Sequence, residues 1–117
     1  GDAGRPYNCV AGAEGGPGWT DRRDALQDRF CTELVHLNPD FQTGEGYDVD
    51  APGEGNLTMC TNYVAQTHDC LAMTLEMPFK DTAETPNDIT GWSPERARKL
   101  GEACLGALYR GVDDLRE

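Results

Sequence analysis

The sequence has few basic residues. Its 117 residues include 10 Lys and Arg against 21 Asp and Glu, which leaves a formal net charge of −11 at pH 7. A surface of this sign repels nucleic acids and anionic membranes, because proteins hold such partners with a basic footprint. We therefore expect neither nucleic acid nor membrane among the partners of this protein.

Long apolar runs are also absent. The apolar runs extend over only a few residues, whereas a helix needs about 20 to cross a bilayer. No basic-then-apolar leader is visible, and the chain begins at Gly1 rather than Met, so it is processed, engineered or cut from a longer chain. The length and composition are typical of one small globular unit, which we expect to span residues 1–117. We expect the protein to be cytoplasmic.

The cysteines show no regular framework. Their number is five, which cannot all pair within one chain, and no Cys-x-x-Cys spacing occurs. Cys31, Cys60 and Cys104 fall on apolar stripes of expected helices, where a thiol behaves as a small hydrophobe. We expect reduced core cysteines rather than a disulfide scaffold. His68 with Cys60 and Cys70 matches no common zinc-ligand spacing, so a local zinc site is not favoured.

Apolar residues recur at helical spacing in three segments, and each segment follows a residue that favours a helix N-terminus. The expected helices are Asp21–Leu37 after Thr20, Leu57 to about Gln66 after Asn56, and a C-terminal helix from Pro94 after Ser93. Residues 39–55, between the first two, are rich in glycine and proline and predict a long loop. Loops of this length inside a compact domain are often functional.

One segment alternates as a β-strand does. Leu71, Met73, Leu75 and Met77 point to one side, and the residues between them point to the other. The second side is small and mixed rather than charged, which predicts a covered central strand in an α/β fold. No neighbouring strand is obvious in this chain, and a sheet needs partners, so we expect the missing strands to precede Gly1.

Glu76 is the first candidate for a functional residue. It stands at the C-terminal end of the expected strand, on the side that also carries Ala72 and Thr74. A buried carboxylate is costly unless a partner or a reaction uses it, and strand ends are common positions for catalytic groups in α/β sheets. The residues alone leave three alternatives open: catalysis, a structural ion pair, or exposure at the strand end.

The segment Leu71–Asp81 resembles part of a known family. It is similar to the C-terminal part of zinc carboxypeptidases, specifically the bacterial cytosolic-carboxypeptidase-like group. Further stretches match in the same order along nearly the whole chain: Pro6–Asn8 with Ala11–Gly15, Asn38–Thr43, Ala51–Glu54 with Asn56–Met59, Thr61–Val64, and Gly91–Arg96. Several unrelated motifs agree and none is of low complexity, so the resemblance is specific.

The resemblance implies a fold and a missing portion. Residues 1–117 would be the C-terminal portion of a zinc carboxypeptidase catalytic domain, which is a three-layer α/β/α fold with a mostly buried mixed sheet. The family's zinc ligands, two His and one Glu, would all precede Gly1, and Ala3 replaces the Glu usual in the family. The cofactor of the complete protein would be zinc, but no ligand is expected in this chain, which alone would be inactive.

The resemblance also implies site residues and a substrate class. Glu76 aligns with the family's general base, which takes a proton from the attacking water and passes it to the leaving amine. Tyr47, in the loop 39–55, is the candidate for the family's mobile substrate-binding tyrosine, the alternative being an ordinary exposed tyrosine. The partners would be C-terminal tails of peptides or proteins. Lys80 either attracts acidic tails or is simply a solvated lysine.

A second function stays open from the sequence. Because no zinc ligands are expected in the chain and Ala3 replaces an acidic residue, the chain is alternatively a non-catalytic, acidic α/β module that binds a partner.

Overall fold

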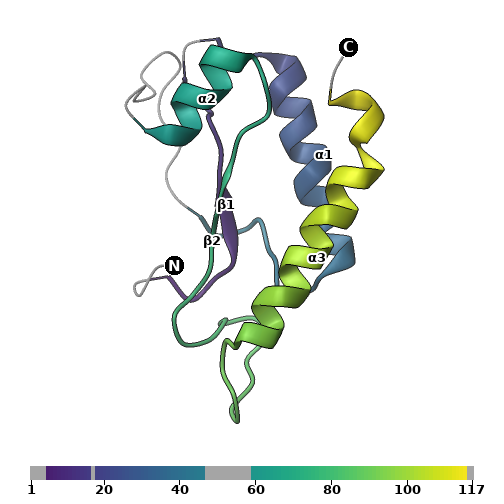
Figure 1. The fold of residues 1–117 in the computed structure, drawn as a ribbon. Helices are drawn as coiled ribbons and strands as arrows, with labels where there is room; N and C mark the ends of the chain where they lie inside the picture. Colours follow the sequence, from purple (N-terminus) through teal and green to yellow (C-terminus); the bar gives the residue numbers. More distant parts are fainter. Residues whose placement is uncertain (1–4, 17, 47–58, 116–117) are drawn as a thin grey trace.

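The computed structural model describes residues 5–16, 18–46 and 59–115. Along this part of the chain the elements follow in the order β1 (Cys9–Ala11), α1 (Asp21–Leu37), α2 (Cys60–His68), β2 (Thr74–Glu76), α3 (Pro94–Arg110) and the 3-10 turn η1 (Val112–Asp114). Helices α1 and α3 pack side by side along one flank of the β1–β2 ribbon, and α2 lies near one end of it (Figure 1). None of the described helices combines the length and apolar character that crossing a membrane requires.

Helix α1 has the predicted bounds. The Thr20 hydroxyl oxygen accepts a hydrogen bond from the backbone N–H of Arg23 at 3.2 Å, which satisfies a donor that the first turn leaves unpaired. At the other end, Asn38 adopts an extended backbone. Pro39 follows it, and a proline disfavours helical geometry in the residue before it.

Helix α3 begins as predicted. The Ser93 hydroxyl oxygen accepts a hydrogen bond from the backbone N–H of Arg96 at 3.3 Å. Pro94 occupies the first turn, where its missing N–H removes no intrahelical bond. The helix ends at Arg110, where the chain continues into η1.

The core lies between α1, α3 and one side of the segment that contains β2. Leu71, Met73, Leu75 and Met77 all pack against the buried cluster, so the predicted alternation is confirmed. The buried members of the cluster are Phe30, Cys31, Leu34, Phe41, Leu100, Ala103 and Ala107.

The strand prediction is wrong in its length and in its partner. Strand β2 comprises only Thr74–Glu76, and it pairs antiparallel with β1 of the same chain. The β1 strand has three residues among glycines and prolines, too few to show a period of two. Thr74 is exposed and Glu76 is half-buried, so the expected covered strand is not found among the described residues. The three-layer arrangement and the buried mixed sheet stay predictions.

Helix α2 begins at Cys60 rather than at the predicted Leu57. Met59 precedes it with an extended backbone and no capping side chain, while the expected cap, Asn56, lies outside the described residues. The helix ends at His68, where Asp69 takes a left-handed φ of 47° and its backbone N–H bonds to the helix.

The five cysteines are all free thiols, and they differ in burial. Cys31 is buried in the core, and desolvation together with the nearby negative charge of Asp28 raises the pKa of its thiol to about 11. Cys104 is half-buried, and burial also raises its pKa. The predicted core position of Cys60 is wrong, because this residue is exposed at the first turn of α2.

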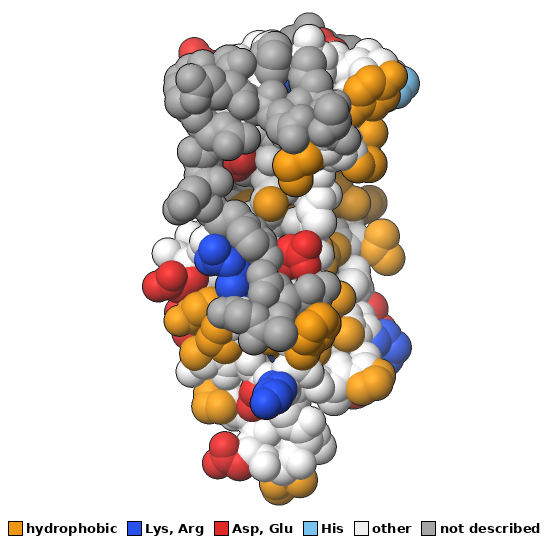
Figure 2. All heavy atoms as spheres, turned by 90° about the vertical axis from the view of Figure 1, so that its left-hand side faces the viewer, with side chains coloured by type: hydrophobic (Ala, Val, Ile, Leu, Met, Phe, Trp, Pro, Cys, Tyr) orange, Lys and Arg blue, Asp and Glu red, His pale blue; other side chains and the backbone are white. Residues whose placement is uncertain are grey.

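On the flank of the ribbon opposite α1 and α3, the described helices cover only one end, where α2 lies (Figure 1). Figure 2 views this flank and shows several groups of hydrophobic side chains at the surface. Large hydrophobic residues that are more than half exposed include Met59, Tyr63 and Phe79.

A glycine exchange tests the turn before α3. Gly91 has a left-handed φ of 61°, and a Cβ there would collide with the Lys80 carbonyl oxygen, which already accepts the Trp92 N–H. We expect Gly91→Ala to lower the free energy of unfolding by at least about 2 kcal/mol, measured by urea unfolding of the purified protein.

The matched control is Gly101→Ala. Gly101 is exposed in the middle of α3, and a Cβ there meets nothing within 4 Å. This exchange is expected to raise stability by about 0.5–1 kcal/mol through helix propensity. Equal stability of the Gly91→Ala variant and the wild type would contradict the close packing of this turn.

Candidate functional site

Glu76 projects from the ribbon away from the helical core. It ends β2 and lies directly opposite Cys9 of β1. Its neighbour Leu75 packs against the core, and successive strand residues point to opposite sides. The carboxylate therefore stands at the C-terminal end of the strand, half-buried, on the side that α1 and α3 do not cover.

Helix α2 borders the side of the ribbon that carries Glu76. The hydroxyl groups of Thr61 in α2 and Thr74 in β2 share a hydrogen bond of 2.6 Å. Because Thr74 and Glu76 are two residues apart in one strand, their side chains share a face. The start of α2 therefore lies against the face from which Glu76 projects.

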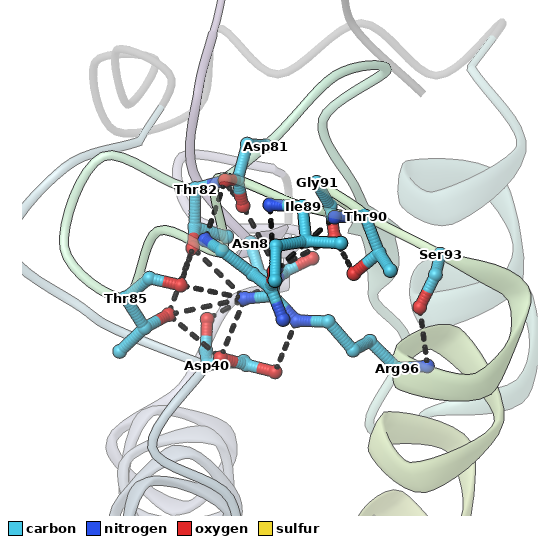
Figure 3. A network of polar contacts seen from close by, with 11 residues as sticks. Asn8, Asp40, Asp81, Thr82, Thr85, Ile89, Thr90, Gly91, Ser93 and Arg96 are labelled. Atoms are coloured by element: carbon cyan, nitrogen blue, oxygen red, sulfur yellow. Dashed lines mark hydrogen bonds and ion pairs between the residues drawn. The ribbon is translucent and has the colours of Figure 1, made fainter.

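A cluster of polar residues, here called the Arg96 cluster, lies beyond the end of β2 (Figure 3). Its members are Asp40, Asp81, Thr82, Thr85, Gly91 and Arg96. Figure 3 shows the Arg96 side chain reaching from α3 into the loop that joins β2 to α3. Its Nε and Nη2 atoms donate to the two carboxylate oxygens of Asp40 at 3.1 and 2.9 Å.

The remaining donors of Arg96 bind the loop itself. Nη1 donates to Asp81 Oδ1 at 2.8 Å and to the Gly91 carbonyl oxygen at 2.9 Å. Nη2 also donates to the Thr82 hydroxyl at 3.1 Å and to the Thr85 carbonyl oxygen at 2.8 Å. The planar guanidinium supplies these donors in fixed directions, which a lysine does not match.

The charges of this cluster stabilise one another. The hydrogen bond from Arg96 holds the pKa of Asp40 below its usual 3.8, and the Thr85 hydroxyl adds to the effect. The pKa of Asp81 is also below its usual 3.8. The main cause is the hydrogen bond from the backbone N–H of Asn87, and the hydrogen bond from Arg96 is the second. Both carboxylates are thus ionised at neutral pH and bonded on several sides, which is typical of a structural network rather than a reactive site.

The Arg96 cluster is connected to β1 as well as to β2. The side-chain amide of Asn8, the residue before Cys9, donates to the Asp40 carbonyl oxygen at 2.9 Å. The Asn8 carbonyl oxygen in turn accepts the side-chain amide of Gln42 at 3.0 Å. Asn8 is fully buried. The start of β1 and the end of β2, where Glu76 lies, are therefore both next to the Arg96 cluster.

Sequence reasoning missed this cluster. Its charged residues Asp40, Asp81 and Arg96, and Asn8 that bonds to it, each lie in a different motif of the family resemblance. The signal was present, since four of the motifs each contain one of these polar or charged residues. Sequence spacing could not show that these residues meet, because up to 56 positions separate Arg96 from Asp40.

The structure addresses only part of the other expected site. Tyr47 lies outside the described residues, so its predicted role is not addressed by the structure. Lys80 is exposed just after β2. Within residues 5–16, 18–46 and 59–115, no group of three His, Cys, Asp or Glu side chains is placed to hold a metal ion.

Solved structures of other proteins are similar to this chain in fold and in sequence. A Shewanella denitrificans OS-217 protein, provisionally a carboxypeptidase A, matches with a TM-score of 0.97 and 47% identity over 100% of this chain and 31% of its own. A metallo-carboxypeptidase from Pseudomonas aeruginosa, solved in complex with (2-guanidinoethylmercapto)succinic acid, matches with a TM-score of 0.92 and 47% identity over 95% of this chain and 29% of its own.

A sequence relative has the same proportions. An uncharacterized protein of Zymomonas mobilis subsp. mobilis is 43% identical over 115 residues, which are 98% of this chain and 30% of that protein. No family model matches the chain. The chain thus spans less than a third of the length of these relatives.

Acid should weaken the Arg96 cluster. The pKa of Asp40 is lower in the folded protein than its unfolded value of 3.8. The ionised carboxylate therefore stabilises the fold above pH 3.8, and this stabilisation is lost as the pH falls through the folded pKa. We expect the free energy of unfolding to fall between about pH 5 and pH 2, and Asp40→Asn to be less stable at pH 7 but to lose less in acid. Urea unfolding across this range measures both.

The comparison variant is Glu95→Gln, which removes an exposed ion pair with Arg98 on α3. Exposed pairs contribute little, so its stability should follow the wild-type pH curve closely. Parallel curves for Asp40→Asn and the wild type would contradict the assigned role of the Asp40 carboxylate.

Proposed function

From the homology of this chain to metallo-carboxypeptidases over its whole length, we propose that it is the C-terminal portion of a zinc metallocarboxypeptidase catalytic domain. The observation that carries the proposal is the position of Glu76. The carboxylate stands at a strand end, half-buried, on the face of the ribbon that α1 and α3 do not cover, within a chain that matches such enzymes at a TM-score of 0.92.

Glu76 would act as the general base of the complete enzyme. Its carboxylate would take a proton from the water that attacks the scissile carbonyl, and then deliver that proton to the nitrogen of the leaving residue. The strand pairing with Cys9 fixes the backbone from which this carboxylate projects. The carboxylate is half-buried, so it is only partly exposed to bulk water.

The described residues do not fit a zinc site by themselves. They place no three suitable ligands together, so the zinc of the complete enzyme would be held by residues outside them. We propose the cytoplasm as the location, because five free thiols suit a reducing compartment.

The proposed substrates are peptides or proteins that lose their C-terminal residue. The exposed Lys80, four residues after Glu76, supports acidic tails as one class. The ligand of the Pseudomonas aeruginosa relative instead joins a succinic acid to a guanidino group. Acidic and basic C-terminal residues therefore both belong in the substrate panel, and Tyr47 stays the candidate for a substrate-binding tyrosine.

The second candidate function is a partner-binding module without activity. It is favoured by the absence of a metal-binding group in the described part of the chain and by the net charge of −11. The coding sequence upstream of Gly1 separates the two. A His directly before Gly1 with a His-x-x-Glu further upstream supports the enzyme, whereas a start codon at that junction supports the module.

Removal of the base tests the enzyme directly. In the complete protein, we expect Glu76→Gln to lower kcat by at least about 100-fold, because general-base catalysis typically contributes that much, while the zinc content stays unchanged. Glu84→Gln is the control, since Glu84 is an exposed loop residue. Near wild-type turnover in the Glu76 variant would remove this residue from the mechanism.

Metal content tests the division of the site. We expect the 117-residue chain to bind no stoichiometric zinc and to cleave no peptide, because its described residues group no metal ligands. The complete protein should contain zinc and lose its activity on treatment with a chelator. Metal analysis by mass spectrometry measures this, and stoichiometric zinc in the short chain would be the contrary result.

A further inference from the structure

The two strands of the ribbon are fixed at one end by the Arg96 cluster. On the β1 side, Asn8 precedes Cys9 and bonds to the backbone of Asp40 through its side-chain amide. On the β2 side, the chain reaches Asp81 five residues after Glu76 and bonds there to Arg96. The pair formed by Cys9 and Glu76 is the last of the ladder and lies nearest to the cluster in both strands.

The chain after Glu76 is held from three directions. The Lys80 carbonyl oxygen accepts the Trp92 N–H, Asp81 accepts Arg96, and the Ala83 N–H donates to the Pro6 carbonyl oxygen at 2.8 Å. Pro6 belongs to the segment that leads into β1, so the last contact ties the two strand extensions together. This network restricts where the end of β2 can lie.

Arg96 is the central charge of this network. Its side chain is 15% exposed, and those of Asp40 and Asp81 are 17% and 25% exposed, so water cannot easily replace the guanidinium. Without it, the two carboxylates would repel each other, as the effect of Asp81 on the pKa of Asp40 indicates. The segments that carry them would then move apart, and one of these segments extends β2.

We propose that Arg96 is a positioning residue for Glu76, and this inference rests on the proposed function. It holds the strand extensions on both sides of the last ladder pair, so that the Glu76 carboxylate keeps a fixed place relative to the substrate. A displacement of about 1 Å at a catalytic group can lower turnover by 100-fold. Arg96 therefore acts on kcat through Glu76, without contact with the substrate.

The test uses the complete protein and two substitutions on the same helix. Arg96→Lys keeps the charge but loses the planar set of donors. Arg98→Lys is the matched control, because Arg98 is 59% exposed and pairs only with Glu95 and Glu102 in the described part of the chain. We expect Arg96→Lys to lower kcat by about 10- to 100-fold with KM and zinc content nearly unchanged, and Arg98→Lys to change none of them.

A double substitution separates positioning from a general structural role. If Arg96 acts through Glu76, then Arg96→Lys should lower the residual kcat of Glu76→Gln by less than about 2-fold, since residues that act as a unit are not additive. An equal loss in both backgrounds would overturn the inference, as would wild-type kcat in Arg96→Lys. Should that variant fail to fold, Asp81→Asn replaces it, with the same expectations.

Failure of the proposed function gives a different result. If the wild-type protein releases no C-terminal residue from any peptide of the panel, the enzyme assignment fails, and hydrogen–deuterium exchange then decides the structural part. Faster exchange of backbone amides in residues 71–83 of Arg96→Lys, but not of Arg98→Lys, supports the positioning of β2 by Arg96. Unchanged exchange overturns it.

Discussion

The bonds of Arg96 to Asp40 and Asp81 are the interaction on which the other contacts depend. They join the turn after α1 to the loop after β2 and to the first turn of α3, and Asp40 is 56 positions from Arg96 in sequence. A partly buried ion pair stabilises a fold only when its remaining donors and acceptors are also satisfied. The threonine hydroxyls, the Gly91 carbonyl oxygen and the Trp92 ring, 4.9 Å from the guanidinium, meet that condition.

The apolar core and the Arg96 cluster each fix a different part of the segment that carries Glu76. The core fixes one side of β2, because Leu75 and its alternating neighbours pack against α1 and α3. Alternation then sends Glu76 to the other side, and the cluster fixes the strand beyond it. Met59, Tyr63 and Phe79 stay more than half exposed. Such exposure of large apolar side chains is consistent with a portion of a longer domain, as proposed.

Local signals predicted what is local. Thr20, Ser93 and Pro94 mark helix starts within a few residues, and the alternation of 71–77 gave the correct core side of the strand. The start of α2 was missed because no side chain caps it, and β1 because three residues show no period. Strand β1 pairs with β2 across more than 60 positions of sequence, so nothing in either segment could indicate the pairing. The position of Glu76 at a strand end was predicted correctly, and its half-buried state lies between the buried carboxylate and the strand-end exposure that the sequence left open.

The residues that carry the family resemblance are mostly not chemical groups of a reaction. Asn8, Asp40, Asp81 and Arg96 build one network, and only Glu76 among the matched positions of the described chain is proposed to react. Similarity at these positions therefore supports a shared scaffold first and an activity second. The two are nevertheless connected, because the network meets both strands at the pair formed by Cys9 and Glu76. With the proposed positioning of Glu76 by Arg96, a chain that keeps these scaffold residues also keeps the place of that carboxylate, and this is how the resemblance bears on chemistry.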